Sequence, residues 1–235
     1  MSNKFIAVDG GKGGVGKSTL SILISDYLMR NGEDLAVVDA DKTNPDVARL
    51  FNNAEAENVT AILAGLQSAQ GFVELYDVME KEIDGHDIVL SLPATLDMRP
   101  YVADIAEVCK EMDLEIVHVF VINRQWDSIN LLKESMENGL ASIADRKVVV
   151  RNGFFGDHDD FSRWDSSKTR SAFLESGGEE IHIPGILDIT MDAVLELNKP
   201  FSEAAVRGAG LSIGIGVQTK NWLKGVDERL ASLEL

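Results

Sequence analysis

Short apolar runs rich in β-branched residues recur along the chain and alternate with longer segments of helical spacing. The apolar runs are Phe5–Val8, Leu35–Val38, Asp87–Leu92, Ile116–Ile122, Lys147–Val150 and Glu180–Ile183. Their apolar positions are mostly continuous, which is typical of strands covered by helices on both faces. The segments with helical spacing are Ser18–Arg30, Pro100–Met112 and Ser128–Ala144. This alternation predicts an α/β fold with a doubly wound, mostly parallel sheet flanked by helices.

The C-terminal segment carries one apolar stripe at helical spacing, which predicts a helix around 217–233. The stripe consists of Trp222, Leu223, Val226, Leu230 and Leu233. Basic residues on the other face are offset by acidic ones, so we expect this helix to pack on its own domain rather than on a membrane. The chain of 235 residues has no internal repeat or Pro/Gly-rich linker, and residues 1–235 are expected to form a single domain.

The charge balance is strongly acidic. Lys and Arg total 22 against 39 Asp and Glu, a net charge of -17. Such a chain repels phosphate backbones and anionic lipid, so we expect neither strong DNA binding by the protein alone nor membrane binding. The single cysteine, Cys109, excludes a disulfide framework, and no apolar stretch reaches the ~18 residues of a membrane helix. These features favour a cytoplasmic protein.

One motif identifies a phosphate-binding loop, G-x-x-x-x-G-K-[ST]. It follows the first apolar run and opens the first helical segment, as the motif requires. Glycines allow successive backbone N–H groups to point at phosphate oxygens, the lysine reaches the β- and γ-phosphates, and the serine ligates Mg²⁺. The nucleotide-binding residues predicted here are Gly11, Lys12, Gly13, Gly14, Val15, Gly16, Lys17, Ser18 and Thr19.

An alternative is a dinucleotide site, because Gly11, Gly13 and Gly16 also fit G-x-G-x-x-G. Asp39, at the end of the second run, would then hold a ribose hydroxyl. We favour the phosphate loop because Lys17 and Ser18 follow the last glycine directly, and a dinucleotide site needs neither.

Lys12–Thr19 resembles the deviant Walker A motif, KGGxGK[ST], of the ParA/MinD family of partition and cell-division ATPases. The resemblance implies a P-loop NTPase fold, ATP and Mg²⁺ as ligands, and a homodimer that forms on ATP binding. In that family the extra lysine, here Lys12, reaches the partner subunit's phosphates and is therefore a predicted catalytic residue. A mobile cation at this place can neutralise charge that develops on the transferred phosphoryl group.

Asp39 and Asp41 resemble the D-x-D of the family's first switch. By that match, Asp39 joins Ser18 in supporting the magnesium ion and Asp41 orients the attacking water. The alternative is that one of these carboxylates caps the helix expected near Pro45–Leu50.

The Walker B strand departs from the family. Ser91 stands where the family has an aspartate after an apolar strand. A hydroxyl can accept a hydrogen bond from a magnesium-bound water but supplies no negative charge. Asp39, Asp41 or Asp97 could compensate. The departure predicts slow hydrolysis.

Asn152, at the end of the fifth run, is predicted to read the adenine edge, as in relatives with an Asn at a late strand end. Asn123 is a competitor for this role. Either residue could instead belong to a turn.

The first functional hypothesis is an ATP-dependent dimer switch that recruits an unidentified protein partner. The late strand ending Asn152–Gly156 resembles the TraL-like ATPases of conjugative plasmids, which implies a role in plasmid transfer or partition. The alternatives are a regulatory module that binds nucleotide without hydrolysing it, and a transferase or synthetase that uses ATP on a small substrate.

Overall fold

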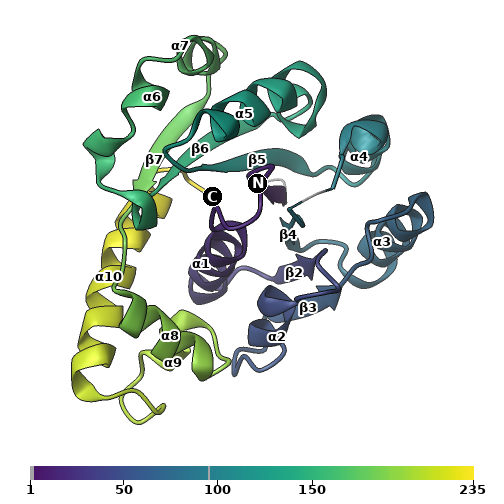
Figure 1. The fold of residues 1–235 in the computed structure, drawn as a ribbon. Helices are drawn as coiled ribbons and strands as arrows, with labels where there is room; N and C mark the ends of the chain where they lie inside the picture. Colours follow the sequence, from purple (N-terminus) through teal and green to yellow (C-terminus); the bar gives the residue numbers. More distant parts are fainter. Residues whose placement is uncertain (1–2, 95) are drawn as a thin grey trace.

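The computed structural model describes residues 3–94 and 96–235, and in them seven strands form one wholly parallel sheet (Figure 1). The strand order is β3-β2-β4-β1-β5-β6-β7. The strands are β1 (Lys4–Asp9), β2 (Leu35–Asp39), β3 (Val59–Leu63), β4 (Asp87–Ser91), β5 (Glu115–Ile122), β6 (Arg146–Asn152) and β7 (Glu179–Ile183). The expected doubly wound α/β fold is confirmed, and the order of strands reverses direction around β1.

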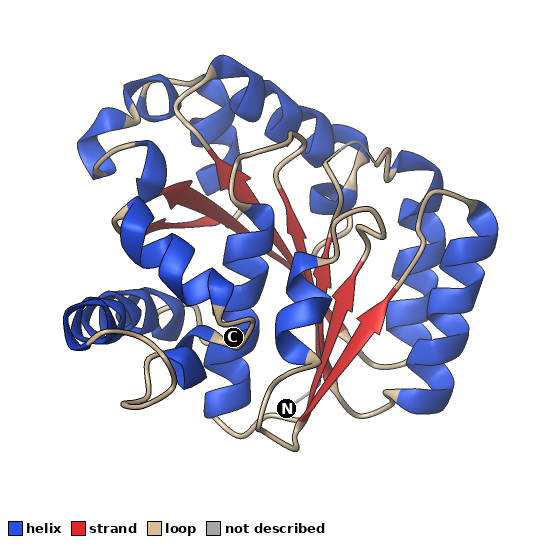
Figure 2. Cartoon of the chain, turned by 60° about the horizontal axis from the view of Figure 1, so that its bottom comes forward, coloured by secondary structure: helices blue, strands red, loops and turns tan. Residues whose placement is uncertain are grey.

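Helices cover both faces of the sheet, as Figure 2 shows. The α-helices are α1 (Lys17–Arg30), α2 (Asp46–Phe51), α3 (Ala69–Glu82), α4 (Val102–Glu111), α5 (Trp126–Asn138), α6 (Ser162–Asp165), α7 (Lys168–Glu175), α8 (Asp188–Glu196), α9 (Phe201–Ala204) and α10 (Ile213–Ala231). Short 3₁₀ turns are η1 (Arg99–Tyr101), η2 (Leu140–Ser142), η3 (Gly153–Phe155) and η4 (His158–Asp160).

The continuous apolar runs are explained by burial on both faces. In β1, Ile6 and Val8 pack with α1, α2 and α8–α10, whereas Phe5 and Ala7 pack with α3 and α4. A further cluster joins β5 and β6 to α5–α7. Because all strands are parallel, their carboxyl ends meet at one edge of the sheet, which is where ligands bind in doubly wound folds.

Two elements near the sheet edge were not predicted from the sequence. β3 is an edge strand with partly exposed residues, so it lacks the long apolar run of a central strand. α3 follows it and buries Phe72, Leu75 and Met79, whose spacing is a helix signal; Ser68 caps its start by accepting from the Gly71 amide.

The predicted helix over Ser128–Ala144 was wrong at its end. α5 stops at Asn138, where Gly139 adopts an extended backbone and a 3₁₀ turn follows. The predicted C-terminal helix is present as α10, and it packs on its own domain through Leu223, Val226 and Leu230. Within the described ranges, none of the helices combines the length and hydrophobicity needed to span a bilayer.

Candidate functional site: a phosphate loop and its cavity

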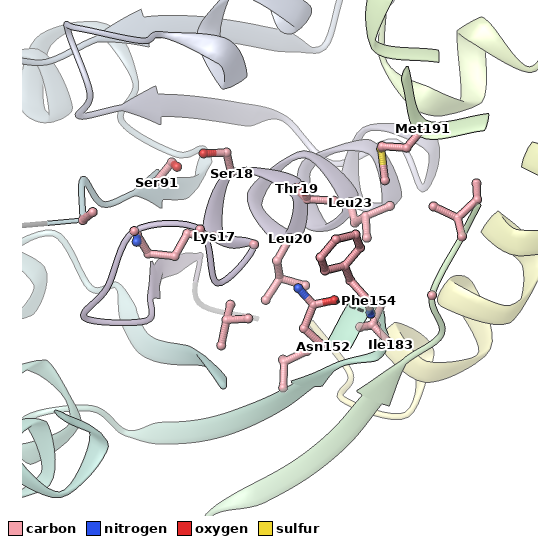
Figure 3. Close-up of a pocket in the computed structure, with 18 of the residues that line it drawn as sticks. Lys17, Ser18, Thr19, Leu20, Leu23, Ser91, Asn152, Phe154, Ile183 and Met191 are labelled. Atoms are coloured by element: carbon pink, nitrogen blue, oxygen red, sulfur yellow. Dashed lines mark hydrogen bonds between the residues drawn. The ribbon is translucent and has the colours of Figure 1, made fainter. Parts of the chain in front are cut away.

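A cavity of about 650 Å³ opens at the carboxyl ends of the strands (Figure 3). One end is formed by the phosphate loop and the first turn of α1. The other end is more apolar and is formed by the loops after β6 and β7, α8 and α10. The residues lining the cavity include Gly13, Gly14, Gly16, Lys17, Ser18, Thr19, Asp41, Ser91, Asn152, Phe154, Pro184, Ile186, Met191 and Trp222. Segments far apart in the sequence therefore meet around one elongated space.

The phosphate loop has the backbone that its glycines permit. Gly14 and Gly16 lie in the left-handed region, with φ of 74° and 101°. Gly16 also has no room for a side chain, because a Cβ there would lie 2.3 Å from the Asn152 Nδ2. The loop can thus curl tightly before α1, as a phosphate cradle requires.

The N-terminus of α1 is open to the cavity. Gly16 is its N-cap residue, and among the described residues no side chain caps it and no acid occupies its first turn. The unsatisfied N–H groups and the positive end of the helix dipole therefore favour an anion here.

Lys17 is a buried cation, only 7% exposed. Its Nζ donates to the Lys12 carbonyl oxygen at 2.6 Å, and no described carboxylate pairs with it. Burial lowers the pKa of Lys17, against the raising effect of the nearby Asp9 and Asp41 carboxylates. A buried ammonium without an ion-pair partner fits an anionic ligand, so the cradle and Lys17 together fit the phosphates of a nucleotide.

Lys12 lies on the outer side of the same loop. Its Nζ pairs with the Asp127 carboxylate in the first turn of α5, at 2.9 Å. Both side chains are exposed, at 48% and 65%. The structure thus places Lys12 outside the cavity of its own chain.

The two carboxylates after β2 differ in their surroundings. Asp39 is buried, and its oxygens accept from the backbone amides of Asp41, Val47 and Ala48. Burial raises the pKa of Asp39, although these amides oppose the shift. Asp39 caps α2 in this structure and does not line the cavity. This arrangement does not supply the ribose contact of a dinucleotide site.

Asp41 lines the cavity. Its Oδ1 accepts from the amides of Thr43 and Asn44 at 3.0 and 3.1 Å. Among the described residues, Oδ2 accepts no protein hydrogen bond. Asp41 is therefore the carboxylate of the D-x-D pair that is available to a ligand.

Ser91 ends β4 beside Asp39, its partner in the sheet register. Figure 3 shows the Ser18 and Ser91 hydroxyls pointing toward each other at the phosphate end of the cavity. Hydroxyl and carboxylate oxygens are the donors that Mg²⁺ prefers. Ser18, Ser91 and Asp41 fit this ion by donor type, with Asp41 as the single carboxylate of the set. Asp97, the other acid considered, is exposed and pairs with Arg99.

Asn152 lies at the cavity and Asn123 does not. Asn123 accepts from the Gln125 amide and the Ser128 hydroxyl at the start of α5, so it is a turn residue. Asn152 donates to the Val15 carbonyl and accepts from the Phe154 amide. Of these two asparagines, only Asn152 lines the cavity.

Two parts of the site were not anticipated from the sequence. At the end of β1, Asp9 accepts from the Gly10 and Gly11 amides and lies 3.4 Å from Nε2 of the buried His118. Burial acts to raise the pKa of Asp9, but these hydrogen bonds outweigh it and hold the pKa below its usual value. Asp9 thus fixes the start of the phosphate loop. An acid directly before a glycine-rich loop was a usable sequence signal.

The apolar end of the cavity was also missed. Pro184 follows β7, and its carbonyl accepts from the Trp222 indole at 2.7 Å. Trp222 was expected only to pack against the domain, yet it also lines the cavity. The position of β7 at the same sheet edge could have indicated the Pro184 loop.

The loop, the open helix end and the buried lysine define a nucleotide-binding P-loop NTPase. The family model described as ParA, NUBPL iron-transfer P-loop NTPase, matches residues 2–71. The chain is 31% identical over 225 residues to protein MobD of Acidithiobacillus ferrooxidans, covering 94% of both chains. The chain belongs to the ParA/MinD family of P-loop ATPases, which confirms the resemblance drawn from Lys12–Thr19.

Solved structures show the same fold. The septum site-determining protein MinD from Pyrococcus horikoshii OT3, complexed with Mg-ADP, is 17% identical with a TM-score of 0.57, over 99% of both chains. The cell-division protein MinD from Aquifex aeolicus is 15% identical with a TM-score of 0.58, over 97% of both chains. At these identities the likeness extends to the fold.

Proposed function

We propose that this protein binds ATP with Mg²⁺ and hydrolyses it slowly, acting as a nucleotide-dependent dimer switch. The observation that carries the proposal is Lys17, a buried ammonium that faces the cavity without a carboxylate partner. The MinD from Pyrococcus horikoshii, which shares the fold, was solved with Mg-ADP, and this supports a nucleotide in the same cavity.

Different parts of the cavity bind different parts of the nucleotide. The loop amides and Lys17 hold the phosphates, and the apolar end takes the base and sugar. The Ser18 hydroxyl, with Asp41 and Ser91 nearby, would hold Mg²⁺, which neutralises phosphate charge and supplies Lewis-acid polarisation when bound. Asp41 accepts a hydrogen bond from the attacking water through its free oxygen.

Slow hydrolysis follows from the count of carboxylates. The Ser91 hydroxyl carries no charge. The Asp39 carboxylate accepts hydrogen bonds from the backbone amides of Val47 and Ala48 at the start of α2. Asp41 is therefore the one carboxylate that both supports the Mg²⁺ ion and orients the attacking water. One carboxylate for two tasks leaves the developing charge less well neutralised, and the barrier stays higher.

The dimer switch rests on Lys12. It is exposed on the face of the phosphate loop that lies away from its own cavity, so it can reach a second subunit. ATP closes two subunits face to face, hydrolysis opens them, and the closed surface recruits a protein partner. The resemblance of Asn152–Gly156 to TraL-like ATPases supports plasmid transfer or partition as the setting.

The test combines phosphate release with light scattering in the presence of ATP and Mg²⁺. We expect ATP, but not ADP, to double the scattering mass, with turnover well below the typical enzyme value of about 10 s⁻¹. Dimerisation with no phosphate release would favour the regulatory module, for which Ser91 is the specific observation. Release that requires a small co-substrate would favour the transferase. An unchanged monomer with ATP would contradict the switch.

A further inference from the structure

The Asn152 side chain joins two ends of the cavity. Asn152 is the last residue of β6 and the N-cap of the 3₁₀ turn Gly153–Phe155. Its Oδ1 accepts from the Phe154 amide at 3.0 Å, and its Nδ2 donates to the Val15 carbonyl at 2.8 Å, 137 positions away. Since one partner is a donor and the other an acceptor, the orientation of the amide is fixed.

On the phosphate side, the contact is to the Val15 carbonyl, two residues before Lys17. The Val15 side chain is buried in the core, only 1% exposed. Core packing of this side chain and the hydrogen bond to its carbonyl therefore both hold Val15 in place. Gly16 lies so close to the Asn152 amide that a Cβ would have no space. The second half of the phosphate loop is therefore set against Asn152, and Figure 3 shows the Asn152 amide lying close beneath the start of α1.

On the base side, Asn152 is followed by a tightly packed pair of loops. A Cβ on Gly153 would lie 2.4 Å from the Ile183 carbonyl oxygen and 2.5 Å from the Gly185 nitrogen. The turn after β6 and the turn after β7 are thus in direct backbone contact. Asn152 connects this pair of turns to the phosphate loop.

We propose that Asn152 is a positioning residue that fixes the phosphate loop through the Val15 carbonyl, so that its effect on nucleotide affinity does not depend on the base. This inference rests on the proposed nucleotide binding, and it changes the role predicted for Asn152 from the sequence. One donor and one acceptor of the amide are already used inside the protein. The loop amides bind phosphate best when their geometry is held in advance.

The structure offers a substitution that separates the two contacts. Asn152→Ser keeps a side-chain cap for Phe154, because serine is a good N-cap residue, but it is too short to keep the bond to Val15. Asn152→Ala removes both contacts. The matched control is Asn123→Ser, directly after the neighbouring strand β5, where the side chain accepts from the Gln125 amide and the Ser128 hydroxyl outside the cavity.

The experiment titrates ATP, GTP and inorganic tripolyphosphate into each protein by calorimetry. Loss of this partly buried hydrogen bond predicts an affinity about tenfold weaker for Asn152→Ser with all three ligands, and an unchanged ratio between ATP and tripolyphosphate. Asn123→Ser should bind like the wild type. A variant that weakens ATP alone, and binds tripolyphosphate normally, would overturn the proposal in favour of adenine reading.

Hydrogen exchange of the ligand-free proteins gives a second readout. Asn152→Ser and Asn152→Ala should exchange faster in peptides that cover Gly13–Ser18, while peptides from the strands keep wild-type rates. Faster exchange throughout the domain would show a general loss of stability and would count against a positioning role. A wild-type protein that binds none of the three ligands would refute nucleotide binding itself. The exchange measurement would still test whether the hydrogen bond from Asn152 to Val15 holds the phosphate loop in place.

Discussion

Lys12 and Asp127 form an ion pair, 2.9 Å between Nζ and Oδ2, that holds the extra lysine of the phosphate loop against the start of α5. Exposed pairs of this kind contribute about 0–1 kcal/mol, so the contact restrains Lys12 only weakly. The lysine is therefore available to a second subunit at little cost in free energy.

Replacing Lys12 should affect ATP-dependent dimerisation and turnover far more than ATP binding. Lys12→Ala is expected to keep measurable ATP binding, because Lys17 and the loop amides remain, yet to lose ATP-dependent dimerisation and turnover. Loss of a cation near a developing phosphoryl charge costs several kcal/mol of barrier, on the order of a thousandfold in rate. Sedimentation with ATP and phosphate release provide the measurements.

Asp127→Asn is the matched control for that variant. It frees Lys12 without removing it, so dimerisation should be retained or strengthened a few-fold, and stability should change by less than about 1 kcal/mol. A Lys12→Ala protein that dimerises and hydrolyses like the wild type would eliminate the proposed role of Lys12 in the partner's site.

Restoring a carboxylate at the end of β4 should accelerate hydrolysis. Ser91→Asp places negative charge beside Ser18, and we expect turnover on the order of tenfold faster, equivalent to about 1.4 kcal/mol of barrier. Ser91→Asn has a similar shape without the charge and should show no acceleration. Equal rates for all three proteins would show that another group already fills this role, and rapid wild-type turnover would lead to the same conclusion.

The acidic surface predicts weak DNA binding. With a net charge of -17, the protein alone should not shift duplex DNA near physiological salt, with or without ATP. A mobility assay over a range of salt concentrations measures this. Tight, strongly salt-dependent binding would instead indicate a locally basic face on the closed dimer.

A half-buried carboxylate between β7 and α6–α7, Glu180, predicts how stability depends on pH. Burial acts to raise the pKa of Glu180, but hydrogen bonds from Arg170 and Trp164 and the charge of Arg151 lower it to about 2. The unfolded chain thus binds the proton more readily. Because the carboxylate is partly exposed to solvent, it should contribute about 1–2 kcal/mol above the unfolded pKa, and lose that contribution as the pH falls from about 5 toward 2.

Urea unfolding at several pH values checks this prediction against Glu180→Gln. The variant should be less stable than the wild type at pH 7, and the gap should narrow as the pH falls toward about 3. A gap that is independent of pH would show that the Glu180 charge contributes nothing to folding.

The sequence was most informative where local chemistry dictates structure. Gly16, Lys17 and Ser18 indicated the phosphate loop because its backbone and charge need those residue types. The apolar runs indicated the central strands because burial on both faces demands them. The sequence did not predict β3, because an edge strand is only half buried and needs no continuous apolar run.

Other features depend on contacts between distant segments. The sequence placed Asp39 and Asp41 side by side, but only the position of α2 determines that Asp39 caps that helix while Asp41 faces the cavity. The bond from Asn152 to Val15 likewise arises only when β6 lies two strands from β1. Spacing along the chain carries no information about such pairs.

The central claim is that the cavity beside Lys17 binds ATP, and calorimetric titration of ATP with Mg²⁺ into wild type, Lys17→Ala and Lys133→Ala tests it most directly. Lys133 is an exposed lysine on α5 paired with Glu137, and it serves as the matched control. Removing the buried cation should cost about 2–4 kcal/mol and weaken ATP binding by roughly two decades or more, while Lys133→Ala binds like the wild type. A Lys17→Ala protein that binds ATP as tightly as the wild type would contradict the account.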